Sequence, residues 1–153
     1  MAQDVLIKAD GRGLYDIQVE NNDFASAQGF ETAIPVSLFT DARASSVQVP
    51  QAQNRRGWVG NILYATLDRQ LGGLLWTLSQ ARLTQNTINL AKSYAEGSLQ
   101  WLLEDGLARS IQISVIKASI REIKILIDIF TIDNTVQRYI ILWRSTDFNR
   151  IAA

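Results

Sequence analysis

An alternation of isoleucine near the C-terminus constrains the fold of this chain more than any other feature of its sequence. The four residues are Ile123, Ile125, Ile127 and Ile129. A repeat of two residues places all of them on one face of a β-strand. Residues 111–115 alternate in the same way, and a third apolar run covers residues 136–143. Because the connections are short, we expect an antiparallel three-stranded meander over about residues 108–145.

The third of these strands is apolar on both faces. One face carries Val136, Ile140 and Leu142, and the opposite face carries Tyr139, Ile141 and Trp143. A terminal strand of this kind is an aggregation hazard unless something covers it. Two explanations are open: the strand lies in the centre of its sheet, or another chain adds a strand beside it.

The start of the chain predicts a β-hairpin. Residues 5–7 are apolar, Asp10-Gly11-Arg12-Gly13 is a turn cluster, and apolar and polar residues alternate from Tyr15 to Val19. Glycine favours a turn because it adopts positive φ without steric cost. The alternation after the turn is typical of a half-buried strand.

The middle of the chain predicts helices over about residues 31–39, 71–80 and 85–104. The last is the most strongly patterned, with Thr84 as a suitable N-cap and apolar residues recurring at helical spacing. Gly97 inside it indicates close packing at that point, and Gly72-Gly73 indicates a turn or a close-packing site. Residues 45–57 predict a long polar connection.

These patterns predict a single α+β domain over residues 1–153. It comprises an N-terminal β-hairpin, central helices over about residues 30–105 and the C-terminal three-stranded antiparallel meander. No segment divides the chain, and the strongly apolar run Tyr139–Trp143 is far shorter than the ~20 residues that span a bilayer. We therefore expect no membrane contact.

Two absences exclude much chemistry. The chain has no His and no Cys, so serine and cysteine triads in their usual form and zinc sites built on these residues are excluded. A phosphate-binding glycine loop is also missing. We expect no catalytic residue, no metal, no cofactor and no small-molecule substrate. The enzymatic alternative is a carboxylate-dependent cell-wall glycosidase, for which Glu104-Asp105 is the most prominent pair, but neighbouring residues at a helix end do not face each other.

The stretch from Asn54 to Trp58 is the most unusual in the chain, because Arg55 and Arg56 stand next to an indole. It has three interpretations: a loop pinned by intramolecular Arg–acid pairs, a protein interface anchored by Arg and Trp, or a nucleic-acid site. We favour the first two. The chain carries 15 basic and 15 acidic residues, whereas nucleic-acid binders are usually basic.

Several motifs resemble a small tail protein of Mu-like phages. They are Glu31–Ile34, Ser37–Ala44, Arg55–Gly60, Gly72–Leu78 and Ala91–Gly106. The resemblance covers roughly residues 14–115, and the last two strands match only in pattern. The chain departs from the family's usual residues at Asn54, Val59, Asn61 and Leu74.

The resemblance implies a baseplate wedge component of a contractile tail, similar to the small lysozyme-like wedge protein of T4-like phages. It implies that the helical part joins larger wedge subunits near the hub, with the hub or tube proteins as further neighbours. It also implies that the C-terminal sheet accepts strands from the sheath protein and so templates sheath assembly. The location implied is a virion tail baseplate or a tailocin-like particle, assembled in the bacterial host cytoplasm.

Charge is divided along the chain in a way that suits contacts with unlike neighbours. The first 53 residues carry seven acidic and three basic residues, and the remainder carry eight acidic and twelve basic ones. The alternative that requires no partner is that the two ends contact each other within one monomer. The candidate partner-binding residues are Arg43, Arg55, Arg56, Trp58, Val136, Arg138, Ile140, Ile141 and Trp143.

Overall fold

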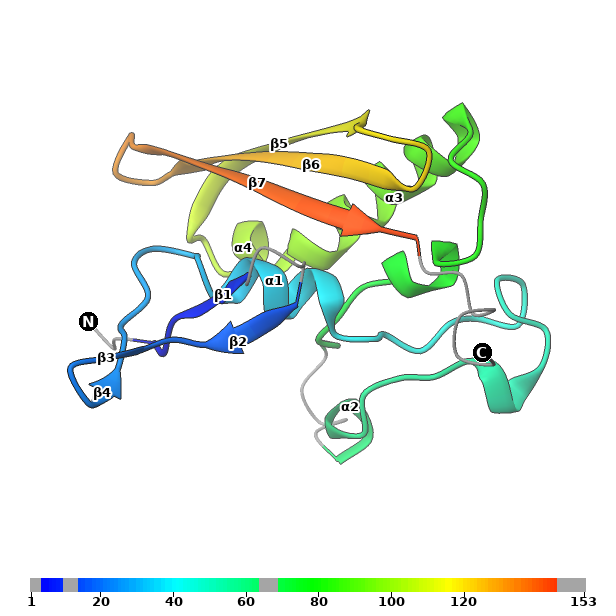
Figure 1. The fold of residues 1–153 in the computed structure, drawn as a ribbon, viewed down its shortest axis with the longest axis horizontal. Helices are drawn as coiled ribbons and strands as arrows, with labels where there is room; N and C mark the ends of the chain where they lie inside the picture. The colour runs from blue at the N-terminus through cyan, green and yellow to red at the C-terminus, as the bar shows by residue number, and fades with distance from the viewer. Residues whose placement is uncertain (1–3, 10–13, 64–68, 146–153) are drawn as a thin grey trace.

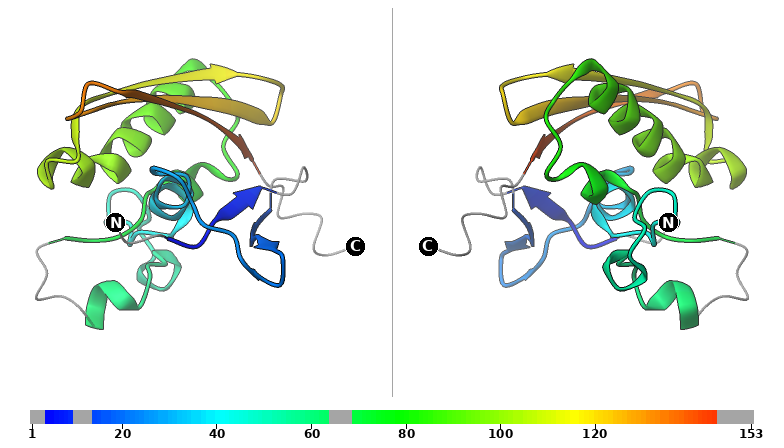
Figure 2. Two further views of the ribbon diagram at one scale, coloured as in Figure 1. Left: turned by 90° about the vertical axis from the view of Figure 1, so that its left-hand side faces the viewer. Right: turned by 90° about the vertical axis from the view of Figure 1, so that its right-hand side faces the viewer.

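The computed structural model describes residues 4–9, 14–63 and 69–145 and confirms the α+β class. A curved sheet forms one layer, helices lie beneath it, and two small strand pairs lie on the far side of the first helix (Figures 1 and 2). The apolar face of the sheet therefore meets the apolar faces of the helices, as a two-layer domain requires.

The C-terminal sheet is the predicted meander. Strands β5 (Ala108–Lys117), β6 (Glu122–Thr131) and β7 (Val136–Arg144) pair antiparallel in the order β5-β6-β7. The four alternating isoleucines lie on β6, the central strand, and all four are wholly buried. Their burial follows from the repeat of two, because every second side chain of β6 points toward the helices.

Strand β7 lies at an edge of the sheet, so the explanation that it occupies the centre is wrong. Its inner face contributes Ile141 and Trp143 to the core. Its outer face leaves Val136, Ile140 and Leu142 exposed. The two apolar faces therefore have different surroundings: one is covered by this chain, and the other is not.

The helices are shorter than the sequence predicts. Helix α1 spans Ala33–Phe39, and the segment predicted as a helix over residues 71–80 holds only the 3₁₀ turn η2 (Leu75–Leu78). Residues 45–57 form the expected connection, which contains the short turn η1 (Ala52–Asn54), and helix α2 (Gly60–Leu63) follows it. The Gly72-Gly73 pair does pack closely: a Cβ on Gly73 would collide with the Ser98 hydroxyl.

The predicted helix over residues 85–104 is divided into α3 (Gln85–Leu99) and α4 (Trp101–Glu104). The Gln100 N–H bonds to the Gly97 carbonyl three residues back, which tightens the turn and ends α3. Thr84 is the N-cap as expected, since its side chain accepts from the N–H of Thr87. The expectation for Gly97 is wrong: a Cβ there would meet nothing within 4 Å.

The N-terminal hairpin is present as β1 (Ile7–Ala9) and β2 (Tyr15–Ile17), and its turn at residues 10–13 lies outside the described residues. The chain then forms a second pair, β3 (Val19–Glu20) and β4 (Asp23–Phe24), rather than one strand to Val19. The alternation predicts that Ile17 and Val19 lie on the buried face of a strand, and this is wrong, because both residues are exposed. Tyr15 is partly buried, and its ring lies 5.4 Å from that of Phe39.

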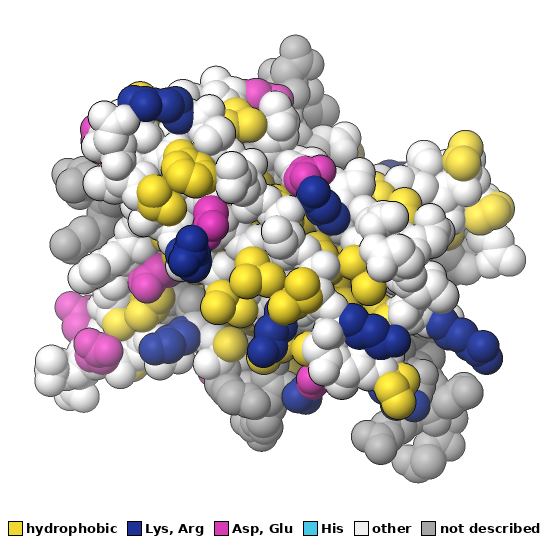
Figure 3. Space-filling model, turned by 90° about the horizontal axis from the view of Figure 1, so that it is seen from above, with side chains coloured by type: hydrophobic (Ala, Val, Ile, Leu, Met, Phe, Trp, Pro, Cys, Tyr) yellow, Lys and Arg dark blue, Asp and Glu magenta, His cyan; other side chains and the backbone are white. Residues whose placement is uncertain are grey.

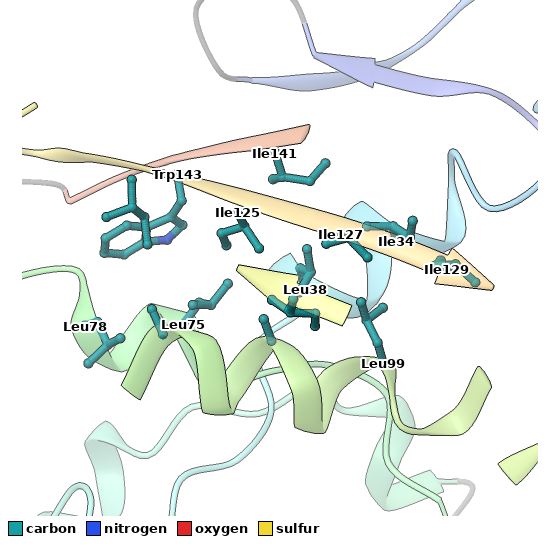
Figure 4. Packing of buried hydrophobic residues seen from close by; sticks show 14 of the residues in the cluster. Ile34, Leu38, Leu75, Leu78, Leu99, Ile125, Ile127, Ile129, Ile141 and Trp143 are labelled. Atoms are coloured by element: carbon teal, nitrogen blue, oxygen red, sulfur yellow. The ribbon is translucent and has the colours of Figure 1, made fainter. Parts of the chain in front are cut away.

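One core joins the layers (Figure 4). The inner face of the sheet packs on α1, α3 and η2 through residues that include Ile34, Leu38, Leu75, Leu99 and the β6 isoleucines. The N-terminal third is tied to this core by polar contacts as well. The Phe30 N–H donates to the Tyr139 hydroxyl at 3.0 Å, and Thr32 bridges Val5 and Ile7.

Candidate functional site

Arg55 organises the polar connection from within. Its Nε donates to the Val49 carbonyl at 2.8 Å and its Nη2 to the Pro50 carbonyl at 3.0 Å. Its own carbonyl accepts from the Ala44 N–H at 3.0 Å. The guanidinium therefore closes the loop over backbone carbonyls that have no partner in a helix or strand.

Arg56 is held against the body of the domain. Its Nη1 lies 3.1 Å from the Asp41 carboxylate, and its guanidinium carbon lies 4.9 Å from the ring centroid of Trp76. Arg43 donates to the Arg56 carbonyl at 3.1 Å. These contacts match the interpretation of a loop pinned within the monomer. Arg55 pairs with carbonyls and Arg56 with an acid and an indole.

Trp58 differs from these arginines because much of its side chain stays exposed. Its backbone N–H donates to the Asp41 carbonyl at 2.9 Å, and its ring covers Gly60, where a Cβ would collide with it. The residue is 43% exposed. It stands at one wall of a cleft of about 820 Å³, whose other walls include Leu71 and Trp101.

The cleft is mostly apolar, and its described lining residues include one carboxylate, that of Glu104, and one cation, that of Arg69. The neighbouring Asp105 is engaged by both terminal nitrogens of Arg69, and this pairing lowers the pKa of Asp105. Glycoside hydrolysis uses two carboxyl groups facing one substrate. The cleft presents no such pair, so its described residues give no support to the glycosidase alternative.

The free edge of β7 is the second candidate surface. Hydrogen bonds join Ser145 to Arg121 at one end of the β6–β7 ladder and Thr131 to Thr135 at the other. Antiparallel partners alternate between hydrogen-bonded and non-hydrogen-bonded pairs, so the odd-numbered residues of β7 bond to β6. The N–H and C=O groups of the even-numbered residues point away from the sheet. These residues are Val136, Arg138, Ile140, Leu142 and Arg144.

The outer side chains of β7 are apolar between two ion pairs. Arg138 bonds to Asp128 with a 2.6 Å contact, and this lowers the pKa of Asp128; Arg144 pairs with Glu122. The exposed Ile140 and Leu142 lie between them, and this face of the molecule shows hydrophobic side chains with basic and acidic ones among them (Figure 3). The edge thus combines a partly apolar surface with backbone groups that have no partner among the described residues.

The candidate residues fall into two separate groups. Arg43, Arg55, Arg56 and Trp58 meet around the polar connection, whereas the β7 residues lie on the sheet (Figure 1). Within β7, Ile141 and Trp143 face the core, and the other three face outward. The sequence did not reveal the cleft. Its walls come from residues near 60, 71 and 101, and no local pattern links such distant segments.

Further ligand types find no counterpart in the described parts of the chain. No group of three acidic residues there is placed to hold a metal ion. None of the described helices is long and apolar enough to cross a membrane.

Comparison with known proteins connects this geometry to a family. The family model described as phage protein GP46 matches residues 30–136, which run from just before α1 to the start of β7. The baseplate protein gp46 of Escherichia phage Mu is 36% identical over 110 residues, covering 71% of this chain and 72% of that protein. The Mu-like prophage FluMu protein gp46 of Haemophilus influenzae is 40% identical over 81 residues, 53% of each chain. This chain belongs to the phage protein GP46 family.

Proposed function

We propose that this chain is a structural component of a phage-type tail baseplate. The support is its family and its likeness to a protein named as a baseplate protein of phage Mu. A structural rather than enzymatic role agrees with the one carboxylate among the described residues of the cleft and with the use of Arg55 and Arg56 as loop contacts. The particle is a virion or a tailocin-like device, assembled in the bacterial host cytoplasm.

The finer proposal is that the chain is a wedge subunit. Its helical part joins larger wedge proteins near the hub, next to hub or tube proteins, and its sheet accepts strands from the sheath protein. The free edge of β7 carries this proposal. It offers outward N–H and C=O groups over the length of a nine-residue strand, and main-chain hydrogen bonds are what an added strand uses.

The β7 residues have different tasks in this proposal. Val136, Arg138 and Ile140 contact the added strand directly, through backbone groups and outer side chains. Ile141 and Trp143 keep β7 seated on the core, so that its edge is held ready to pair. A strand held in place in this way loses little further freedom when another pairs with it.

The test is replacement of Ile140 by proline in a particle-producing strain. Proline removes an N–H that points to the free edge and leaves the β6–β7 ladder complete. We expect baseplates that contain the chain but carry no extended sheath. Ile140→Ala is the control, because it trims the side chain and keeps the N–H. Full-length contractile sheaths on Ile140→Pro particles would overturn the strand-pairing proposal.

A further inference from the structure

We propose that the cleft beside Trp58 is a docking site for a basic, amphipathic segment of a neighbouring protein. That segment inserts a large apolar side chain between Trp58 and Trp101 and places a Lys or Arg at Glu104. The inference rests on the proposed baseplate role, because it concerns how the chain is held by its neighbours. It concerns a surface separate from the β7 edge.

The walls of the cleft are fixed before any partner arrives. The Asn61 side chain donates to the Leu71 carbonyl at 2.8 Å and accepts from the Leu71 N–H at 2.9 Å. The Trp101 indole donates to the Ser37 hydroxyl at 3.0 Å. Both polar groups are thus already bonded within this chain, and the surface of the cleft is mostly apolar. A preformed pocket of this kind binds without the cost of ordering its own walls.

The surface beside the cleft needs a cover. Helix α2 has only four residues, yet Ile62 is 71% exposed and Leu63 is 73% exposed. Val59 and Trp58, which precede the helix, are exposed as well. Apolar side chains gathered beside an apolar cleft are typical of protein interfaces, and tryptophan is the residue most often found at their energetic centre.

Charge determines which kind of segment fits. Arg69 also lines the cleft and interacts electrostatically with Glu104, but both of its terminal nitrogens bond to Asp105, so these three groups together carry a net charge of −1. Glu104 forms no hydrogen bond or ion pair with the described residues, and its carboxylate lines the cleft. A partner that brings a cation satisfies this carboxylate, and one that brings a carboxylate or phosphate is repelled.

The first experiment uses two small probes on the intact chain. Tryptamine carries an indole with a cation, and indole-3-propionate carries an indole with an anion. We expect tryptamine to shift the NMR signals of the Trp58 and Trp101 indoles at several-fold lower concentration, up to about fivefold, as suits one exposed ion pair. Glu104→Gln should remove this preference. Glu96→Gln is the matched control, because Glu96 lies on α3 and pairs with Lys92.

Two results would overturn the docking site in that experiment. One is that neither probe shifts the signal of the Trp58 indole or that of the Trp101 indole. The other is a preference for tryptamine that survives Glu104→Gln, since the charge discrimination would then come from elsewhere.

The second experiment separates the docking site from the proposed function. Ile62→Lys places a positive charge on the apolar surface beside the cleft, which disfavours an apolar contact and repels a basic segment. Ile62 is exposed, so we expect the monomer to fold, and circular dichroism will verify this. We expect the variant to be missing from purified baseplates, whereas Ile140→Pro remains in them and lacks sheath. Normal incorporation of Ile62→Lys would refute the docking site and leave the β7 proposal intact. Normal sheaths with Ile140→Pro would refute the β7 proposal and leave the docking site intact.

Discussion

Proline substitution at two adjacent positions of β7 should have opposite consequences for the monomer. The N–H of Ile140 points to the free edge, and that of Ile141 bonds to Ile125 on β6. The two side chains also differ in exposure: Ile140 is 60% exposed and Ile141 is 8% exposed. Both variants carry the same fixed φ, so a comparison between them isolates the hydrogen bond and the buried side chain.

The magnitude follows from these two differences. Ile141→Pro leaves the Ile125 carbonyl without its partner, which costs about 1–3 kcal/mol in a buried setting. It also removes part of a buried isoleucine from the core, at a further cost of about 1–2 kcal/mol. Ile140→Pro loses neither, and the change at an exposed site should cost less than about 1 kcal/mol beyond the shared backbone effect. We therefore expect Ile141→Pro to be less stable than Ile140→Pro by about 1–5 kcal/mol.

Urea unfolding measures this difference. The free energy of unfolding is obtained from circular dichroism and from tryptophan fluorescence, and coinciding transitions justify a two-state analysis. Equal destabilisation by the two prolines, or a greater effect at Ile140, would show that the assigned hydrogen-bonding pattern of β7 is wrong. The proline that tests strand addition would then have to stand at an odd-numbered residue, because the free N–H groups of β7 would belong to those residues.

The buried face of β6 should be far more sensitive than its outer face. Ile127→Ala should lower the free energy of unfolding by about 2–5 kcal/mol and Leu126→Ala by less than about 1 kcal/mol, and similar losses in urea titrations would contradict the assigned faces. Thr84→Ala removes the N-cap of α3 and should cost about 1 kcal/mol in the same assay, whereas no loss would show that the cap bond is unimportant. Arg138 lowers the pKa of Asp128, so this pair stabilises the fold above the unfolded pKa of about 3.9, and the stability is lost as pH falls through the folded pKa. Arg138→Gln should therefore weaken the loss of thermal stability below about pH 4, and an unchanged acid dependence would refute the linkage.

The sheet could be predicted from the sequence because its signal is local and strong. Isoleucine at every second position of β6 has one physical solution, a strand with one side against a core. Asn134, in the turn between β6 and β7, has a φ of +61°, a conformation that asparagine adopts more readily than most residues. What the pattern could not decide was the order of the strands. A strand that is apolar on both faces suits the centre of a sheet and a covered edge equally, and only the pairing places β7 at the edge.

The shortened helices show where local patterns mislead. Residues 71–80 have leucines at helical spacing, but Gly73 is held at the Thr40 carbonyl with a 2.9 Å bond, which keeps the chain extended there until η2. Ile17 and Val19 alternate as a half-buried strand does, yet both are exposed in the monomer. In each case tertiary contacts, or their absence, override a short periodic signal.

The candidate loop was found by its composition, and its architecture came from contacts distant in sequence. An Arg-Arg-Gly-Trp stretch indicates either an interface or a pinned loop, and the residues have separate tasks here. The two arginines are used within the chain, and the tryptophan remains at the surface. Asp41 determines this outcome: its carboxylate holds Arg56, and its carbonyl accepts from the N–H of Trp58. One acid therefore positions the loop so that its indole faces the cleft.

The two proposed contacts make different demands on their partners. Strand pairing at β7 uses backbone groups, which every amino acid except proline supplies, so this edge accepts many sequences in one geometry. The cleft uses a fixed apolar shape and one carboxylate, so it selects particular side chains. In the proposed role, the chain pairs with sheath strands at β7 and takes one defined position among its neighbours through the cleft. The first contact requires a tolerant surface and the second a selective one. Substitutions in the partner should accordingly be tolerated opposite β7 and poorly tolerated opposite Trp58.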